Sequence, residues 1–377
     1  MPWKEATTMS QREEFVTKAL EEDANVSKLC QAYGISRKTG YTWLKRYQAE
    51  GREGLRDRSR RPRHSPTQTP KEIEQAILDA RKRHPAWGGR KLKRWLENRG
   101  HSDLPAPSTI TAILHRHGQL DPKESAKHRP YTRFEKARPN ELWQMDFKGH
   151  FKVGNGQRCH PLTVLDDHSR FLIGLKACPD ETQHTVQEHL TAFFRAYGLP
   201  ERVLTDNASP WGDNNTYRPY TALTVWMLRL SIPISHSRPY HPQTLGKDER
   251  LHRTLDDELL STTAFDGLLD CQAGFDQWRD LYNLERPHDA LDLDPPITRY
   301  HPSERPFPET LPPLLFPPGA AIRKVDSSGR TQFQRRRLRV GKAFRGQAVG
   351  LQHDQFADGL VHVFFNNIHI RTLDLRR

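Results

Sequence analysis

Three acidic residues in the central part of the chain have the types and positions that divalent metal ions require. Asp146 lies in a segment predicted to be a strand, Asp206 ends a short buried strand, and Glu249 lies on a later helix. Mg²⁺ takes hard oxygen ligands, and two Mg²⁺ about 4 Å apart can clamp the attacking and leaving oxygens of a phosphodiester. Two or three converging carboxylates would therefore suffice for phosphodiester chemistry without a covalent enzyme intermediate.

Each of these acids also has a plainer structural interpretation when it is considered alone. Asp146 could belong to a turn at the end of its strand, and Asp206 with Asn207 could form an Asx turn. Glu249 could pair with Arg253 one helical turn later, which stabilises a helix by only about 0.2–0.5 kcal/mol. The elements around the acids must therefore show whether the three carboxylates can converge.

The elements expected around the acids follow the order of an α/β layer. Three successive strands are followed by alternating helices and strands, which is the order of an RNase H-like fold, although this order alone leaves other α/β folds open. Such a sheet can place Asp146 and Asp206 at one edge. The strands are expected at 142–151, 158–168, 171–178, 202–206 and 234–237, and the helices at 182–197, 221–230 and about 245–260.

The first 51 residues have the pattern of a helix-turn-helix. Helices are expected at 10–23, with Ser10 as its N-cap, at 26–33, and from Ser36 to about residue 48 after a turn at Gly34. The third helix carries polar and basic residues near its start, where a recognition helix contacts base edges: Arg37, Lys38, Thr39 and Thr42. The alternative is an ordinary three-helix bundle with a basic face.

A second, weaker helix-turn-helix pattern covers residues 70–120. Apolar residues mark three further helices, the last capped by Ser108, and Arg90 and Lys91 lie on the outside. The linker before it is rich in arginine and proline, and an arm of this kind could follow phosphates or enter a minor groove. A solvated tether is the plain alternative for its arginines, which include Arg58, Arg60, Arg61 and Arg63.

The charge distribution separates the ends of the chain from its middle. The formal charge is +13 over 377 residues, with +13 in residues 1–140, −8 in 141–310 and +8 in 311–377. Basic ends around an acidic middle suggest a metal-using core between arms that bind a polyanion. The four scattered cysteines predict neither a zinc site nor disulfides. Neither a signal segment nor a membrane span is evident, so we expect a reduced, cytosolic protein that works on the nucleoid.

The last part of the chain is expected to be a small β domain. Short strands are predicted at 322–325, 330–340, 348–352 and 361–365, with a hairpin turn at 327–329. Basic residues cluster on the second strand, namely Arg335, Arg336 and Arg337. We expect an SH3-like barrel that contacts the DNA backbone, and a solvated basic strand is the alternative.

Four segments in the middle of the chain resemble the integrase core of insertion-sequence transposases. They are Trp143-Gln-Met-Asp146-Phe-Lys-Gly149, Leu165-Asp-Asp-His-Ser-Arg170, Leu204-Thr-Asp206-Asn207 and the run from His236 to Leu255 (HSRPYHPQTLGKDERLHRTL). The chain is similar to the four-eighty-one group of insertion sequences, relatives of retroviral integrases, over nearly its whole length. The resemblance implies an Asp-Asp-Glu triad of Asp146, Asp206 and Glu249 that holds two Mg²⁺ or Mn²⁺ ions.

The resemblance also implies an activity and its partners. The chain is expected to be a DNA transposase that binds terminal inverted repeats, cuts DNA and joins the ends to target DNA as a dimer or larger assembly. Around the triad, Lys247, Arg250 and Arg253 could hold phosphates, Asp166 and Asn207 are interpreted as structural or supporting residues, and His241 as a DNA contact or a structural histidine. Asp167 is the chief rival for a place in the triad.

Two other classes of function compete with this one. A silent DNA-binding regulator would have lost the acids, and a serine or tyrosine recombinase would need a nucleophilic hydroxyl. The expected domains are a helix-turn-helix, an Arg/Pro-rich linker, a second helix-turn-helix, a linker, an RNase H-like integrase core, a Pro-rich linker and a small β-barrel. Their expected bounds are 1–51, 52–69, 70–120, 121–138, 139–305, 306–319 and 320–377.

Overall fold

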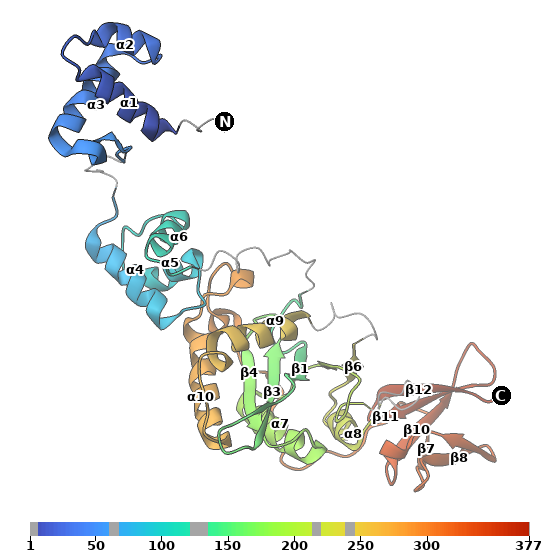
Figure 1. Cartoon of the computed structure of the whole chain (residues 1–377). Coiled ribbons are helices and arrows are strands. Elements are labelled where there is room, and N and C mark those ends of the chain that lie inside the picture. Colours follow the sequence, from blue (N-terminus) through green and yellow to red (C-terminus); the bar gives the residue numbers. More distant parts are fainter. Residues whose placement is uncertain (1–6, 60–67, 121–134, 213–219, 238–245, 377) are drawn as a thin grey trace. The chain divides into compact units, whose positions relative to one another are not determined.

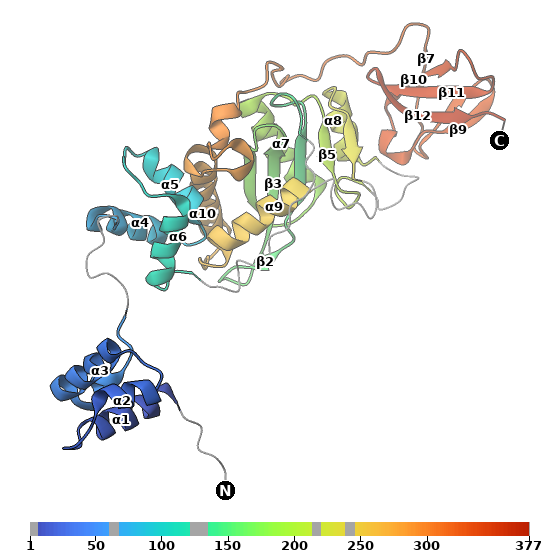
Figure 2. The same ribbon diagram turned by 90° about the horizontal axis from the view of Figure 1, so that it is seen from above.

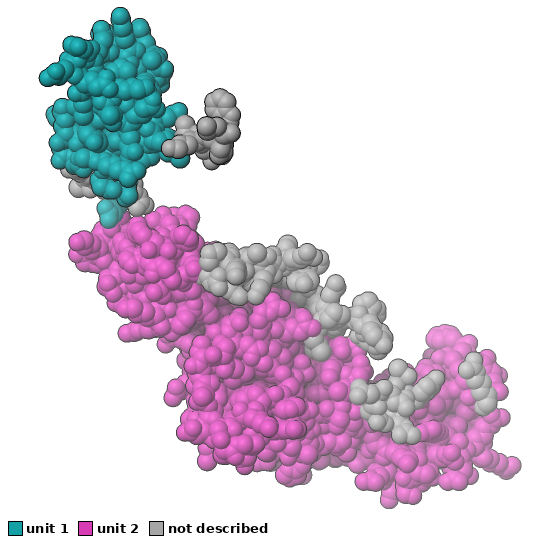
Figure 3. Space-filling model, viewed as in Figure 1, with its two compact units in different colours: residues 1–68 teal, residues 69–377 magenta. Residues whose placement is uncertain are grey.

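The structure is a computed structural model that describes residues 7–59, 68–120, 135–212, 220–237 and 246–376. The chain divides into two compact units, Met1–Gln68 and Thr69–Arg377, drawn in teal and magenta in Figure 3. Every helix among the described residues is too short or too polar to cross a lipid bilayer.

The first unit contains the predicted helix-turn-helix. Its helices are α1 (Thr8–Ala19), α2 (Val26–Ala32) and α3 (Arg37–Glu50). Gly34 makes the turn between α2 and α3 with a φ of 64°, which a residue without a Cβ adopts at little steric cost. Gly40 of α3 is buried, and a Cβ added to it would lie only 2.5 Å from Cys30 Sγ of α2. The small residue thus allows α3 to pack closely on α2.

Side-chain caps fix where the helices of this unit begin. Ser36 Oγ accepts the Thr39 N–H at 3.1 Å, as the sequence predicts for the third helix. The predicted cap of the first helix was wrong, because Thr7 rather than Ser10 accepts the first free N–H, that of Ser10 itself, and α1 therefore starts earlier.

The second unit begins with three helices that form a small core of their own. They are α4 (Lys71–Arg83), α5 (Gly89–Glu97) and α6 (Pro107–Arg116) (Figure 1). Trp87, Leu92 and Ile110 are fully or almost fully buried between them. Ser108 is not the cap of α6, because Pro107 occupies the first helical position and leaves Ala106 as an N-cap without a side-chain hydrogen bond.

His84 makes the stability of this three-helix region depend on pH. Its ring stacks on Trp87 at 3.8 Å, and burial lowers the pKa of His84 to about 4. The unfolded chain, with a pKa near 6.5, binds the proton first, so stability is full above that pH and is lost as pH falls toward 4. Between pH 7 and pH 5 this shift corresponds to about 2 kcal/mol. The ring is only half-buried, so we discount this by about half for solvent screening, and His84→Gln should lose about 1 kcal/mol less unfolding free energy than wild type. Urea unfolding at both pH values measures this, and equal losses would contradict it.

The central sheet runs in the order β2-β3-β1-β5-β6, and β4 pairs with β3. Its strands β1, β3 and β4 are antiparallel neighbours, whereas β5 and β6 run parallel to β1. The predicted meander followed by alternating helices and strands is therefore observed. The bounds are β1 (Trp143–Phe147), β2 (Phe151–Lys152), β3 (Arg158–Asp166), β4 (Leu172–Cys178), β5 (Val203–Thr205) and β6 (Ile234–His236).

Helices cover both faces of this sheet, as Figures 1 and 2 show. Leu162 and Val164 of β3 pack with the helices of one face, while Leu165 packs with those of the other, which follows the alternation of side chains along a strand. One face carries α7 (Gln183–Tyr197) and α8 (Ala222–Arg229), and the other α9 (Gly246–Leu255) and α10 (Leu268–Asp280). The sequence did not predict α10. Helix α9 continues as a π-helical turn, Asp256–Leu260, within the predicted helix.

The C-terminal region is all β, but its described strands do not close into the predicted barrel. One sheet has the order β12-β11-β10-β7, and β8 pairs only with β9 in a second sheet. Gln334 and Arg335 have φ of 46° and 60°, so a tight turn divides the single strand that was predicted at 330–340. The predicted turn at 327–329 exists, but it links strands of different sheets. The bounds are β7 (Ala321–Lys324), β8 (Arg330–Phe333), β9 (Arg336–Arg339), β10 (Ala348–His353), β11 (Leu360–Phe365) and β12 (Ile368–Asp374).

Candidate active site

The pairing of β1 with β5 brings two of the three acids together. The parallel register places Trp143 beside Val203 and Gln144 beside Leu204. The same offset continued by two residues places Asp146, near the end of β1, beside Asp206, which directly follows β5. Neighbouring strands lie about 4.8 Å apart. The fold therefore sets two carboxyl groups side by side at one edge of the sheet.

The electrostatics of Asp146 agree with this placement. Burial, followed by the negative charge of Asp206, raises the pKa of Asp146 to about 7, although the Phe147 N–H donates to Asp146 Oδ1 at 2.9 Å and opposes the shift. Burial also raises the pKa of Asp206, and the Ala208 N–H at 3.0 Å opposes it. Within the described part of the chain, no lysine or arginine forms a salt bridge with either group. The nearby His236 lowers the pKa of Asp206, but neither carboxyl group has a lysine or arginine partner there.

Glu249 approaches the pair from helix α9. It is an exposed residue in the first turn of this helix, and its charge is the weakest of the causes, after burial and Asp206, that raise the pKa of Asp146. The described residues contain no group of three or more His, Cys, Asp or Glu side chains arranged to hold a metal ion. Asp146 and Asp206 are therefore brought together, whereas Glu249 acts on Asp146 only through its charge and does not complete a closed ligand set among the described residues.

A short relay of hydrogen bonds connects α9 to the strand of Asp146. The Thr163 hydroxyl on β3 donates to the Asp146 carbonyl oxygen at 3.0 Å and lies 2.9 Å from His252 Nε2. Because the single hydroxyl proton is given to the carbonyl, the imidazole must donate through Nε2. Burial lowers the pKa of His252 to about 4, so the ring is neutral at neutral pH. His252 lies three residues after Glu249, and the relay therefore ties the helix of the third acid to the backbone of the first.

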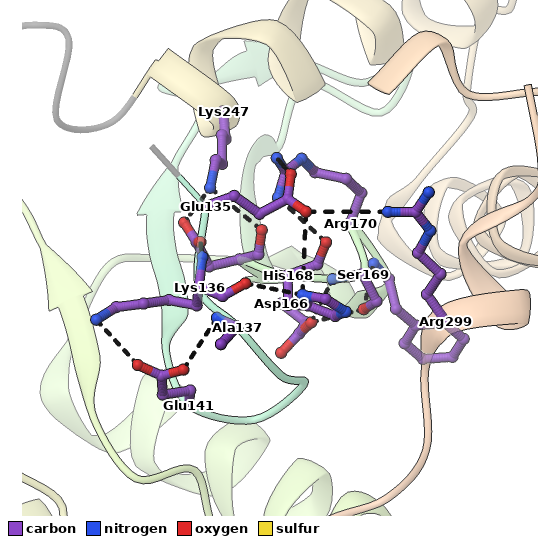
Figure 4. Close-up of polar contacts among 12 residues, drawn as sticks. Glu135, Lys136, Ala137, Glu141, Asp166, His168, Ser169, Arg170, Lys247 and Arg299 are labelled. Carbon is purple, nitrogen blue, oxygen red and sulfur yellow. Dashed lines mark hydrogen bonds and ion pairs between the residues drawn. The ribbon is translucent and has the colours of Figure 1, made fainter. Parts of the chain in front are cut away.

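Asp167, the rival of the triad acids, is committed to a buried polar network. It accepts hydrogen bonds from Gln144 Nε2 at 2.6 Å and from the Lys136 N–H at 2.8 Å, and it forms a salt bridge with Lys247. Figure 4 shows Lys247 and Lys136 around this network. Three partners leave Asp167 little capacity for a metal ion. Lys247, which was predicted to hold DNA, is tied to a carboxylate with its side chain 14% exposed.

Asp166 and Asn207 both have structural contacts. Asp166 is fully buried and accepts from Ser169 N, Ser169 Oγ and Asn140 N at 2.8, 2.6 and 2.7 Å, so it fastens the turn after β3 (Figure 4). Asn207 Nδ2 donates to Ser237 O at 2.8 Å, which joins the ends of β5 and β6. These contacts are structural, and the supporting roles of both residues at a catalytic site stay predictions.

Two further carboxylates near the acids were missed by sequence reasoning. Glu181, after β4, adds to the causes that raise the pKa of Asp146, after burial and Asp206, and it lies 2.7 Å from His160 Nδ1. Asp248, beside Glu249, is fully buried, and neither of its oxygens has a hydrogen-bond partner among the described residues. Burial raises the pKa of Asp248 well above its usual value. No spacing or motif distinguishes these acids from surface carboxylates.

The residues predicted to contact DNA lie on several elements, and some of them share α9 with Glu249. Those of the recognition helix are all exposed at the start of α3, namely Arg37, Lys38, Thr39 and Thr42. Arg58 is exposed and paired with Glu50. Arg250 and Arg253 are exposed on α9. On α5, Arg90 is exposed and Lys91 is half-buried. The basic residues of the β8–β9 turn are all exposed, namely Arg335, Arg336 and Arg337. Outside the described residues lie Arg60, Arg61, Arg63 and His241.

Sequence models of known families match successive parts of the chain. A helix-turn-helix domain matches residues 11–63 and a homeodomain-like domain matches 39–114. Two models of the integrase core domain match 136–242 and 230–296. The C-terminal domain of the IS481 family transposases matches 320–377. Each match covers less than half of the chain, with the helix-turn-helix matches first, the integrase-core matches next and the C-terminal match last.

Individual proteins show the same similarity. The chain is 29% identical over 41% of its length to the "Insertion element IS407 uncharacterized 31.7 kDa protein" of Burkholderia multivorans, and spans about half (53%) of that relative. It is 22% identical over 68% of its length to a "Putative transposase for insertion sequence element IS5376" of Geobacillus stearothermophilus, of which it spans 64%. The HTLV-2 integrase catalytic core domain, solved with magnesium, matches 44% of this chain and 99% of that one, with 18% identity and a TM-score of 0.33.

The domain matches and the fold agree on the relationship. Helix-turn-helix units precede a mixed sheet covered by helices on both faces, and an all-β region follows. The chain is a homologue of insertion-element transposases, with helix-turn-helix units, an integrase core domain and the C-terminal domain of the IS481 family transposases.

Proposed function

We propose that this chain is a DNA transposase that cuts the ends of an insertion sequence and joins them to target DNA, with Asp146, Asp206 and Glu249 as its catalytic acids. The observation that supports this most is the parallel register of β1 and β5, which sets Asp146 beside Asp206 without a salt bridge to lysine or arginine among the described residues. Two carboxyl groups of which one has a pKa of about 7 are held at some cost to stability. A function that uses them explains why the fold keeps them.

The donor set fits Mg²⁺ or Mn²⁺. Asp146, Asp206 and Glu249 offer only carboxylate oxygens, which hard divalent cations prefer, and none of the three forms a salt bridge with lysine or arginine among the described residues. When bound, such ions would lower the charge of the site, activate a water and stabilise the leaving oxygen. We expect two ions. The carboxylates of the chain position the reacting groups, and the neutral His252 with Thr163 keeps the backbone of Asp146 in place.

Thr163→Val should weaken metal binding while it preserves the shape of the side chain. The change removes the hydrogen bond to the Asp146 carbonyl oxygen and leaves His252 Nε2–H without its acceptor, and losing support of this kind typically costs about tenfold in metal affinity. The Mn²⁺ concentration at which the melting temperature begins to rise should therefore increase about tenfold. Thr254→Val is the matched control, because its hydroxyl only bonds back to Arg250 O within α9. Equal Mn²⁺ dependence in both variants would refute the relay.

DNA recognition is assigned to the helix-turn-helix units. The exposed start of α3 offers Arg37, Lys38, Thr39 and Thr42 for base edges, and α5 offers Arg90 and Lys91. The basic β8–β9 turn would contact the DNA backbone. Two element ends must be held together for joining, so the active form is expected to be a dimer or a larger assembly on the nucleoid.

The test of the proposed function is a cutting assay with the full chain. Duplex DNA carrying the sequence that flanks this reading frame is incubated with Mg²⁺ or with EDTA, and the products are examined for new 3′-hydroxyl ends and for strand joining. Metal-dependent cutting at one position supports the proposal. Binding without cutting in Mg²⁺ and Mn²⁺ would favour the alternative of a silent DNA-binding regulator, and a covalent protein–DNA adduct would favour a recombinase that uses a hydroxyl nucleophile.

A further inference from the structure

A pocket lies between the second helical region and the catalytic core. It has a volume of about 460 Å³, and its walls come from the starts of α5 and α6, from α9 and its π-helical turn, and from residues 286–289. The two helix starts are packed tightly, because a Cβ on Gly89 would lie 2.5 Å from Pro107 O. Arg250 of α9, which lines the pocket, directly follows Glu249 in the sequence, so α9 links the pocket to one of the proposed catalytic acids.

The lining of this pocket is rich in positive charge. Five cationic side chains face three carboxylates: Arg90, Lys91, Arg250, Arg253 and Arg286 against Asp257, Glu258 and Asp289. Glu258 forms a salt bridge with Arg286. The carboxylate of Asp289 is shared by Arg90 and Lys91, whose nitrogens lie 3.6 Å from its oxygens. Arg250 and Arg253 form no salt bridge with any carboxylate in the described part of the chain. The pocket therefore holds uncompensated cations.

The pKa values of two groups at the pocket are lowered by burial and by its positive charge. Burial lowers the pKa of Lys91 to about 8, and Arg286 is the next cause, so Asp289 only partly compensates this ammonium group. Burial also lowers the pKa of His288 well below its usual value, and the further causes are all cations, among them Arg286, Lys91 and Arg250. A bound anion would relieve both effects.

Polar contacts hold the two walls of the pocket together. Trp87 Nε1, next to α5, donates to Glu258 Oε1 at 3.0 Å. Arg94 Nη2 of α5 donates to Asp294 Oδ1 at 2.6 Å, and Arg99 Nη2 donates to Glu285 Oε2 at the same distance. The pocket is thus a composite site, in which the second helical region supplies one set of cations and α9 the other.

We propose that this pocket binds backbone phosphates of the DNA duplex beside the phosphodiester on which the acids act. The inference rests on the proposed function and adds a location and an orientation to it. A duplex held here passes from the second helical region along α9 to Glu249. Contacts of this kind are with phosphates, so they position DNA without reading its sequence.

The salt dependence of DNA binding tests this proposal in the full chain. The probe is a short duplex of mixed sequence, and affinity is measured by fluorescence anisotropy over a series of salt concentrations. Each phosphate contact contributes about 0.9 to the slope of log K against log salt, so Arg250→Gln with Arg253→Gln should flatten the slope by about 2. Arg158→Gln, an exposed arginine at the start of β3 outside the pocket, is the matched control and should keep the slope of wild type.

A variant of opposite sign sharpens the test. Asp257 is exposed and lines the same pocket, so Asp257→Asn should increase DNA affinity severalfold because it removes a negative charge. An unchanged slope in the double arginine variant, or an equal loss in Arg158→Gln, would overturn the pocket assignment. Asp206→Asn separates a failure of the pocket from a failure of the proposed function. If Asp206→Asn no longer cuts DNA but the double arginine variant keeps the wild-type slope, only the pocket is refuted. If Asp206→Asn cuts DNA normally, the proposed function is refuted.

Discussion

Asp146→Asn, Asp206→Asn and Glu249→Gln should each lower the rate of DNA strand cutting by at least about 10³-fold, because each removes a carboxylate that the chemistry requires. DNA affinity should stay near that of wild type, since the helix-turn-helix units and the α9 arginines are unchanged. Single-turnover cutting in Mg²⁺ and anisotropy on the same duplex measure the two effects separately.

Asp167→Asn is the control for this series. Asp167 is also an aspartate of the core, but it is fully buried and held by Gln144, Lys136 and Lys247. Its amide should lower thermal stability, because Lys247 loses its charged partner, while cutting at low temperature is reduced far less than in Asp146→Asn. A loss equal to that of Asp146→Asn would place Asp167 in the triad.

Glu258→Ala should cost about 3–5 kcal/mol of unfolding free energy, the largest stability effect expected in this chain. Glu258 accepts from Arg286 Nε at 2.8 Å, from Trp87 Nε1 at 3.0 Å and from Trp278 Nε1 at 3.3 Å. The side chains of Glu258 and Arg286 are only 8% and 7% exposed, so the variant would leave a guanidinium group buried without a partner. Urea unfolding followed by tryptophan fluorescence measures the loss.

The exposed pair of Arg99 and Glu285 provides the comparison. Its side chains are 38% and 44% exposed, and such pairs contribute about 0–1 kcal/mol. Glu285→Ala should therefore change unfolding by less than about 1 kcal/mol. If Glu258→Ala costs no more than this control, the contacts at Glu258 do not hold the second helical region on the core.

Local patterns were sufficient for most elements of the fold. The apolar periodicity of α7, the cap of α3 at Ser36 and the turn at Gly34 are decided by residues within one turn of each other, so the sequence reveals them. The β8–β9 turn was missed because Gln334 and Arg335 adopt positive φ without glycine. The open C-terminal sheets could not be foreseen either, because strand partners are chosen by contacts between distant segments.

The site shows the same division between local and distant information. The triad acids were proposed from motifs, and the register of β1 with β5 agrees with the placement of Asp146 beside Asp206. The relay from His252 through Thr163 joins residues 89 positions apart, and the hydrogen bond from Trp87 to Glu258 spans 171. No periodicity links such pairs. Lys247 was expected at DNA because it lies beside Glu249 in the sequence, but its partner Asp167 lies 80 positions away.

Helix α9 and its π-helical turn carry Glu249 near one end and Glu258 near the other. Nine residues at about 1.5 Å per residue separate them by roughly 14 Å, and each residue turns the helix by about 100°. One inserted or deleted residue between them would swing one glutamate away from its face of the helix, whereas a substitution on the solvent side leaves both in place. In evolution this segment can therefore accept substitutions but not insertions or deletions.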